Sequence, residues 1–276
     1  MIAVTKTRLP VVGRFVGKVA IVTGGANGIG RAVVEELCQE GAAVAFSDLC
    51  ESGAEMAAEL AGCGFDVLFC QGDMAQEAFC RALVERTLAR WGRVDYLVNN
   101  AFSFMAKGLD ATRDDWERVM QTGPLAYALM GQLVAEPMRR GGGGAIVNLS
   151  SISAFIAQPN RWTYNAAKGA VHTLTRCMAL DLAPAHIRVN SVSPGWIWTR
   201  EVDKAAGGDR ARWEPVWGQF HMLERCGDAV ECAGPILFLL SDDASFITAV
   251  DLPIDGGYQG LGSEGIGKAS KFAGSV

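Results

Sequence analysis

Residues 18–30 read KVAIVTGGANGIG and combine a strand, a turn and a helix start. The apolar run at 18–23 has the length of a buried strand. Ile29, Val33 and Leu37 then repeat every fourth residue, as residues on one face of a helix do. A strand that passes through glycines into a helix predicts a dinucleotide-binding turn, because the N–H groups at the helix start are free to bind a pyrophosphate.

The glycines of this turn have separate expected roles. Gly24 suits a tight turn, Gly28 lets the backbone approach a pyrophosphate closely, and Gly30 lets the helix pack against the strand. A second GxGxxG match at 260–265 precedes no amphipathic helix. We therefore interpret only the first match as a binding turn.

Six further apolar runs of strand length alternate with stretches of helical period. Each run is nearly continuous in hydrophobic character, which is typical of parallel strands that are covered on both faces. The order predicts a single doubly wound α/β domain with a seven-stranded parallel sheet flanked by helices on both faces. The further runs lie at 42–48, 66–73, 93–101, 144–151, 187–195 and 249–257, and helices are expected at about 113–139, 162–183 and 228–241.

Composition excludes several classes of function. The 276 residues carry 25 Lys and Arg against 30 Asp and Glu, and this net charge of -5 argues against a nucleic-acid partner. No apolar run approaches the roughly 20 residues of a membrane helix. The first 20 residues lack the continuous apolar core of a secretory signal, so the expected location is the cytoplasm. Eight cysteines without CxxC spacing and three histidines without HExxH predict no metal site.

Asp48 closes the second predicted strand, 18 residues after Gly30. A carboxylate at this place can accept hydrogen bonds from the adenosine ribose hydroxyls and repel a 2'-phosphate. The sequence therefore favours NAD over NADP. Arg31 is the alternative signal, because a cation there can reach a phosphate, and a plain turn or cap residue is the alternative role for Asp48.

Three polar side chains are expected to converge in the second half of the chain. Tyr164 and Lys168 are four residues apart in a predicted helix and so share one face. Ser151 ends the run GAIVNLSS, 13 residues before Tyr164. All three fall where the carboxyl ends of the strands meet, which is where open α/β folds bind ligands.

Five motifs in order, TGGANGIG, NNA at 99–101, Ser151, YNAAK at 164–168 and SPGWIWT at 193–199, resemble the short-chain dehydrogenase/reductase family. The resemblance spans 15–258 and implies a Rossmann-type catalytic domain, which includes a substrate loop or lid at 196–225. Residues 1–14 would be an N-terminal extension. Residues 259–276 would be a tail, either loose or docked on a neighbouring subunit.

The resemblance implies that Tyr164 is the general acid/base, that Lys168 lowers its pKa and binds the nicotinamide ribose, and that Ser151 holds the substrate oxygen. A free tyrosine, with a pKa of about 10, is a poor base at neutral pH, and a nearby ammonium favours its phenolate. The cofactor contacts expected from the glycine turn and from the resemblance are Gly24, Asn27, Gly28, Ile29, Gly30, Asp48, Asp73, Met74, Asn99, Ala101, Tyr164, Lys168, Pro194, Gly195, Ile197 and Thr199.

Two positions depart from the family pattern. Phe102 replaces the usual glycine of NNAG, and Gly123 stands where the family has an asparagine that anchors a water in the proton relay. Pro124 lacks an N–H and crowds the carbonyl of Met120, so we expect a bend in this helix. Gly123 keeps a backbone carbonyl, so a relay through backbone and water is the alternative to the asparagine.

Aromatic residues that follow the fourth, fifth and sixth strands are expected to wall the substrate pocket. They are Phe104, Phe155, Trp196 and Trp198, with Met105 and Trp162 as further neighbours of this space. Core packing or a subunit contact is the alternative for some of them. The charged and aromatic segment that follows suits a mobile lid, or else a solvated pair of helices.

Together these features predict an NAD(H)-dependent oxidoreductase that interconverts a secondary alcohol and a ketone, with a cyclic or polyhydroxylated, sugar-like substrate. The alternatives are an NADPH-dependent carbonyl reductase and a catalytically weakened nucleotide-binding regulatory protein. The resemblance also implies a homotetramer that pairs the helices at 113–139 and 162–183.

Overall fold

The computed structural model describes residues 8–262 and 265, so most of the predicted tail lies outside the described residues. Its centre is a seven-stranded parallel sheet in the order β3-β2-β1-β4-β5-β6-β9. The seven strands are β1 (Val19–Thr23), β2 (Ala43–Asp48), β3 (Val67–Gln71), β4 (Tyr96–Asn99), β5 (Gly144–Leu149), β6 (Ile187–Pro194) and β9 (Asp251–Ile254). The predicted α/β fold class and the seven strands are confirmed.

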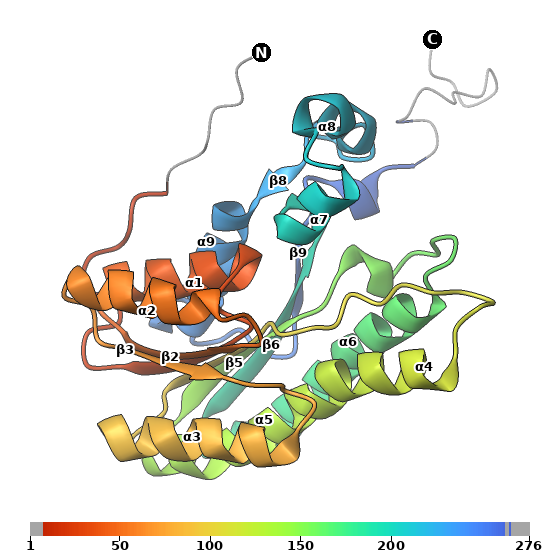
Figure 1. Cartoon of the computed structure of the whole chain (residues 1–276). Coiled ribbons are helices and arrows are strands. Elements are labelled where there is room, and N and C mark those ends of the chain that lie inside the picture. Colours follow the sequence, from red (N-terminus) through yellow and green to blue (C-terminus); the bar gives the residue numbers. More distant parts are fainter. Residues whose placement is uncertain (1–7, 263–264, 266–276) are drawn as a thin grey trace.

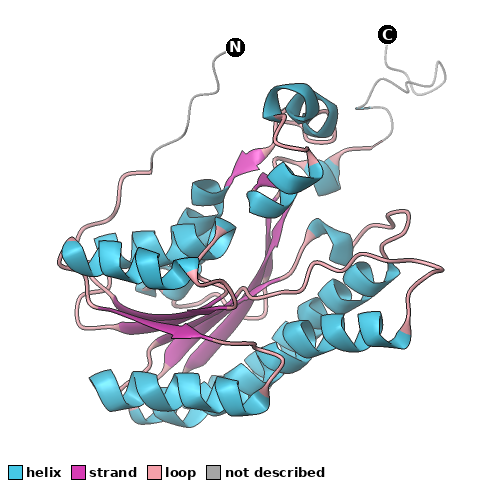
Figure 2. Cartoon of the chain, viewed as in Figure 1, coloured by secondary structure: helices cyan, strands magenta, loops and turns pink. Residues whose placement is uncertain are grey.

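Helices cover both faces of the sheet, as Figures 1 and 2 show. One hydrophobic core packs α1, α2 and α9 against one face, and a second packs α3, α5 and α6 against the other. All five residues of β1 are buried. The helices are α1 (Gly28–Gln39), α2 (Ser52–Gly62), α3 (Glu77–Trp91), α4 (Arg113–Met120), α5 (Ala126–Arg140), α6 (Trp162–Leu182), α7 (Arg200–Ala205), α8 (Arg210–Gly218) and α9 (Ala229–Leu240).

The strand order reverses at β1, which pairs in parallel with β2 on one side and β4 on the other. Chain connections leave this point in opposite directions, so a crevice opens at the carboxyl ends of the strands. Thr23, Asn99 and Leu149 end β1, β4 and β5 at this edge. The fold thereby brings the glycine turn and the segment after β5 to one place.

The helix expected over 113–139 is divided. A π-helical turn, Gln121–Leu125, separates α4 from α5, and Gly123 within it has non-helical angles, φ -99 and ψ -109. Pro124 follows directly and has no N–H to continue the helical hydrogen bonds. The predicted bend at Pro124 is confirmed, and it places Gly123 at the break.

A small two-stranded parallel sheet, β7 (Ile197–Trp198) with β8 (Gly227–Asp228), stands apart from the main sheet. Between these strands the chain forms α7 and α8 (Figure 1). Of the two sequence interpretations for this segment, the structure places a pair of helices there. Whether the pair moves as a lid stays a prediction.

Candidate active site

A cavity of about 830 Å³ lies at the carboxyl ends of the central strands. Its wall includes Gly24, Asp48, Ser151, Tyr164 and Lys168. The cavity thus joins the glycine turn to the three polar side chains that the sequence predicts to converge.

The glycine turn has the backbone that a bound diphosphate needs. Gly24 and Gly28 have φ of 67° and 54°, in the left-handed region that favours glycine. Asn27 flanks α1 without a side-chain cap, and the first turn of α1 carries no acid. Asn27, Gly28 and Ile29 line the cavity, so the uncapped helix start points its partial positive charge at a ligand there.

Gly30 acts through packing and does not line the cavity. A Cβ at this position would lie 2.1 Å from the Gly24 carbonyl oxygen and 2.5 Å from Asn100 Nδ2. Only glycine fits this contact between the helix and the turn.

Asp48 ends β2 and lines the cavity. Its Oδ2 accepts the Ala26 N–H at 3.0 Å and its Oδ1 accepts the Cys50 N–H at 3.0 Å. These bonds hold the carboxylate at the cavity wall. Arg31, the alternative phosphate partner, pairs instead with Glu35 at 2.7 Å and is not part of that wall.

Asp73 and Met74 line the same end of the cavity, as expected. Arg118 donates to Asp73 Oδ2 at 2.5 Å, and Asp73 Oδ1 accepts the Ala75 N–H. Burial raises the pKa of Asp73, but the two hydrogen bonds and the charge of Arg118 together outweigh burial and lower the pKa. The carboxylate therefore stays ionised beside the site.

The prediction that Asn99 contacts the cofactor needs correction. Asn99 is fully buried and its Nδ2 donates to Asn148 Oδ1 at 2.9 Å, within the sheet. Its neighbour Asn100 lines the cavity with Ala101, and Asn100 Nδ2 donates to the Gly24 carbonyl at 2.8 Å. The side chain alternation of β4 turns Asn99 inward and lets Asn100 brace the glycine turn.

The segment after β6 forms the opposite wall. Pro194, Gly195, Ile197 and Thr199 all line the cavity, as the resemblance implies. A residue that sequence reasoning missed, His221, supports this wall: its Nε2 accepts the Trp196 N–H at 3.2 Å. Burial lowers the pKa of His221, which keeps the ring neutral and able to accept this bond.

Ser151 and Tyr164 lie together in the cavity. The Ser151 side chain is buried and its Oγ accepts the Ser153 N–H at 3.1 Å. Burial raises the pKa of Tyr164, while hydrogen bonding to Ser151 and the charge of Arg161 oppose that rise. Tyr164 is thus a neutral phenol in this structure, placed to exchange its proton with a bound oxygen.

Lys168 is buried on the same helix face. Its Nζ donates to the Leu149 carbonyl at 2.7 Å and lies 5.7 Å from the centre of the Tyr164 ring. Burial lowers the pKa of Lys168 to about 7. Tyr164 and Lys168 share the cavity, as predicted, but burial dominates the pKa of each of them.

Phe102 and Gly123, the two departures from the family pattern, are in contact. The Phe102 ring lies against Gly123, where an added Cβ would be 2.5 Å from Phe102 Cε2. The same ring centre lies 3.8 Å from Lys168 Nζ and 5.3 Å from the Tyr164 ring centre. A larger residue at 123 would displace this ring, so the glycine and the phenylalanine are one packing unit behind the lysine.

Of the four predicted pocket aromatics, Phe104 and Trp196 line the cavity. Phe155 and Trp198 are not among its lining residues, and their place in the substrate pocket stays a prediction. Phe155 is exposed and packs edge-on against His172, with ring centres 4.7 Å apart. The Trp198 Nε1 donates to Asp203 Oδ1 at 3.1 Å, and the Trp198 ring centre lies 5.8 Å from that of Trp217.

Two cavity residues were not among the predicted pocket residues: Trp217, which the sequence places in the expected lid segment, and Arg161. Trp217 of α8 lines the cavity and stacks on Trp196, with ring centres 4.9 Å apart and planes at 17°. Trp213 stacks in turn on Trp217 at 5.2 Å. Arg161 also lines the cavity, three residues before Tyr164. The i, i+3 spacing to the predicted catalytic tyrosine was the available signal for Arg161.

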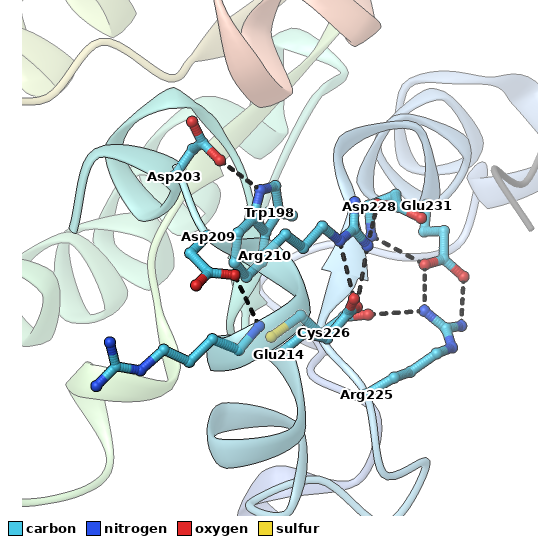
Figure 3. A network of polar contacts seen from close by, with 10 residues as sticks. Trp198, Asp203, Asp209, Arg210, Glu214, Arg225, Cys226, Asp228 and Glu231 are labelled. Carbon is cyan, nitrogen blue, oxygen red and sulfur yellow. Dashed lines mark hydrogen bonds and ion pairs between the residues drawn. The ribbon is translucent and has the colours of Figure 1, made fainter. Parts of the chain in front are cut away.

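A network of polar contacts surrounds α8, as Figure 3 shows. Arg210 of α8 pairs with Glu214 at 2.9 Å and with Asp228 of β8 at 3.0 Å. Arg225 pairs with Glu231 of α9 at 2.6 Å. The Arg210–Asp228 pair joins α8 to β8, and the Arg225–Glu231 pair joins the loop after α8 to α9.

Comparisons with known proteins place the chain in a family. A family model described as Enoyl-(Acyl carrier protein) reductase matches residues 24–259. The chain belongs to this short-chain dehydrogenase/reductase family, and it is a short-chain alcohol dehydrogenase or ketoreductase.

Its relatives have named activities on ring compounds. Cyclopentanol dehydrogenase of a Comamonas strain is 38% identical over 251 residues, which cover 89% of this chain and 98% of the relative. Cis-4-hydroxycyclohexanecarboxylate dehydrogenase of Sinomonas cyclohexanicum is 37% identical, covering 88% and 97%. The crystal structure of levodione reductase matches with a TM-score of 0.84 at 32% identity, covering 90% of this chain and 100% of that one.

Membrane-spanning helices and metal-binding clusters are both absent from the described residues. None of the helices in residues 8–262 is long and apolar enough to cross a membrane. Within the same residues, no group of three His, Cys, Asp or Glu side chains has a geometry that holds a metal ion.

Proposed function

We propose that the protein is an NAD(H)-dependent dehydrogenase that interconverts a secondary cyclic alcohol and its ketone. The observation that carries this proposal is the joint placement of Ser151, Tyr164 and Lys168 in the cavity that the glycine turn also lines. The relatives named for cyclopentanol and hydroxycyclohexanecarboxylate support a ring substrate.

The residues present fit a nicotinamide dinucleotide. The uncapped start of α1 would hold the diphosphate, Asp48 the adenosine ribose, and Lys168 the nicotinamide ribose. When bound, NAD supplies the acceptor for the hydride that leaves the carbinol carbon. Asp48 supports NAD over NADP, because its carboxylate would repel a 2'-phosphate.

The chain's own residues would handle the proton and the substrate oxygen. Ser151 hydrogen-bonds the oxygen, and Tyr164 takes the hydroxyl proton during oxidation and returns it during reduction. Burial holds Tyr164 in its neutral form, which suits the acid role in ketone reduction. A cationic Lys168 favours the phenolate that oxidation requires.

The NADPH-dependent alternative also has an observation in its favour. Arg200 lines the cavity, and its Nη1 lies 3.9 Å from Cys50 Sγ, two residues beyond Asp48. An arginine at this end of the cavity can donate hydrogen bonds to a 2'-phosphate. Titration of the protein with NAD and NADP separately distinguishes the two cofactors.

We propose as well that the protein is a homotetramer and that it is located in the cytoplasm. Leu125 and Leu180 are exposed, and they lie on the helical segments expected to form the subunit contact. All eight cysteines are free, as is typical of a reducing compartment. Light scattering measures the assembly.

A panel of cyclic alcohols and ketones tests the activity. Cyclopentanol, cyclohexanols, cyclic diols and sugars would be incubated with NAD while the absorbance of reduced cofactor is followed. We expect turnover of at least one ring alcohol. No turnover in either direction with NAD or NADP would contradict the proposal and favour a nucleotide-binding regulatory protein.

A further inference from the structure

Arg161 is a cation of the cavity that has no acidic partner in the part of the chain that the structure describes. It directly precedes α6, and its side chain lines the cavity near Ser151 and Tyr164. Among residues 8–262, no carboxylate lies within ion-pairing distance of Arg161, and its guanidinium donates no hydrogen bond. The five N–H donors of this side chain are therefore available to a ligand.

Two aromatic rings contact the Arg161 guanidinium through their faces, so these contacts leave its N–H groups free for hydrogen bonds. Its central carbon lies 5.5 Å from the centre of the Phe104 ring and 5.7 Å from that of the Trp196 ring. Cation–π contacts of this kind favour the charged group electrostatically through the ring faces. The cation is thus placed between two apolar walls, with its N–H donors unpaired.

The loop that carries Arg161 is fixed on both sides. Ser153 Oγ donates to Gln158 Oε1 at 2.6 Å, and Asn165 Nδ2 donates to the Ile156 carbonyl at 2.8 Å. The Asn165 N–H also donates to the Arg161 carbonyl at 2.8 Å. A ligand therefore meets a cation that is already positioned, which lowers the entropy cost of binding.

Other arginines of the cavity have different surroundings. Arg118 pairs with Asp73, and Arg200 lies beside Cys50, both at the end where β2 and β3 finish. Arg161 is close enough to Tyr164 for its charge to lower the pKa of the phenol. Among the arginines that line the cavity, Arg161 is thus the one beside Tyr164.

We propose that Arg161 binds a carboxylate of the substrate, which makes the substrate a cyclic hydroxy acid and the product the corresponding keto acid. This inference rests on the proposed dehydrogenase function. A guanidinium matches a carboxylate through two parallel N–H···O bonds. The i, i+3 spacing of Arg161 and Tyr164 lets one compact ring present its acid to the first and its hydroxyl to the second.

Steady-state kinetics on matched substrates tests the proposal. The probes are 3- and 4-hydroxycyclohexanecarboxylate, their methyl esters and cyclohexanol. We expect wild-type kcat/KM to favour an acid over its ester about 10- to 100-fold, the range for a hydrogen bond to a charged group. Arg161→Met should lower kcat/KM for the acid about 10- to 100-fold more than for the ester or for cyclohexanol, because any change in the Tyr164 pKa acts on all three substrates alike. Arg161→Lys should retain part of the preference, since lysine keeps the positive charge but cannot form the two parallel N–H···O bonds.

Arg200→Met is the matched control, because it removes another cavity arginine and should leave the acid-to-ester ratio unchanged. Equal kcat/KM for acid and ester in the wild type would overturn the proposal. An Arg161→Met variant that loses acid, ester and cyclohexanol activity equally would overturn it as well.

Binding of cyclohexanecarboxylate, which has no hydroxyl to oxidise, separates this proposal from the dehydrogenase assignment. Calorimetry with and without NAD should show weaker binding of this acid to Arg161→Met than to the wild type. If no alcohol is turned over but this difference is found, the proposed activity fails and the acid site stands. If cyclohexyl phosphate binds more tightly than the carboxylate, the acid class is wrong.

Discussion

Replacing Phe102 should change the protonation of Lys168. The ring centre lies 3.8 Å from Lys168 Nζ, and the lysine is almost completely buried. A cation–π contact in a desolvated site stabilises the ammonium by about 2 kcal/mol. Phe102→Leu removes the ring face and keeps an apolar side chain, so the Lys168 pKa should fall by about 1.5 units.

The sign follows from which form the ring favours. Burial already lowers the pKa of Lys168 to about 7, and the ring opposes that effect by stabilising the charged form. Without the ring the ratio of ammonium to amine falls about 30-fold at a given pH below and around neutrality. If the ammonium is the active form, the alkaline limb of the rate profile should move to lower pH.

Nitrogen NMR of labelled lysine side chains measures this pKa directly, with the Lys168 signal assigned by its loss in Lys168→Met. Phe102→Tyr keeps the ring face and should keep the pKa within a few tenths of a unit. Phe104→Leu is the matched control, because it removes a neighbour of the Tyr164 ring that is not in contact with Lys168. An unchanged Lys168 pKa in Phe102→Leu would refute the reasoning.

Two further perturbations test the cofactor preference and the helices over the cavity. Asp48→Ser removes a carboxylate that would repel a 2'-phosphate, so the ratio of NADP to NAD affinity should rise about 100-fold, measured by titration with each cofactor; an unchanged ratio would show that Asp48 does not set the preference. Arg210→Met removes the ion pair between α8 and Asp228, so KM should rise several-fold and hydrogen exchange over 210–218 should become faster. The free energy of unfolding should fall by only about 1 kcal/mol, because both side chains are partly exposed. Arg212→Met, on the same helix, should leave both KM and the rate of hydrogen exchange unchanged.

Much of the fold follows from local sequence signals. Continuous apolar runs identify the seven strands, and the glycine turn fixes the first βαβ unit. The strands β7 and β8 were not predicted, because two residues are too short to show a period. Their pairing depends on contact between segments that are 30 residues apart, Ile197 with Gly227.

The candidate site was predictable where spacing carries the signal. Tyr164 and Lys168 share a helix face by their i, i+4 spacing, and the structure brings both to the cavity. Asn99 and Asn100 are adjacent, and only the pleat of β4 decides which one faces the cavity. The exposure of Phe155 could not be predicted either, because composition does not give the direction of a loop side chain.

The contact between Phe102 and Gly123 could not be read from either residue alone. In the sequence they are two separate departures from a pattern. In the structure the missing side chain at 123 makes room for the ring at 102. Such compensation becomes visible only when the two positions are placed in space.

The most direct test of the central assignment is Tyr164→Phe, measured for both NAD affinity and turnover of a ring alcohol that the wild type oxidises. The substitution keeps the ring that packs against Phe102 and Phe104 and removes only the hydroxyl. We expect kcat to fall by about 100- to 10,000-fold, the range for loss of a general acid or base, with NAD affinity nearly unchanged. Turnover close to that of the wild type would contradict the assignment of Tyr164 as the proton-transfer residue.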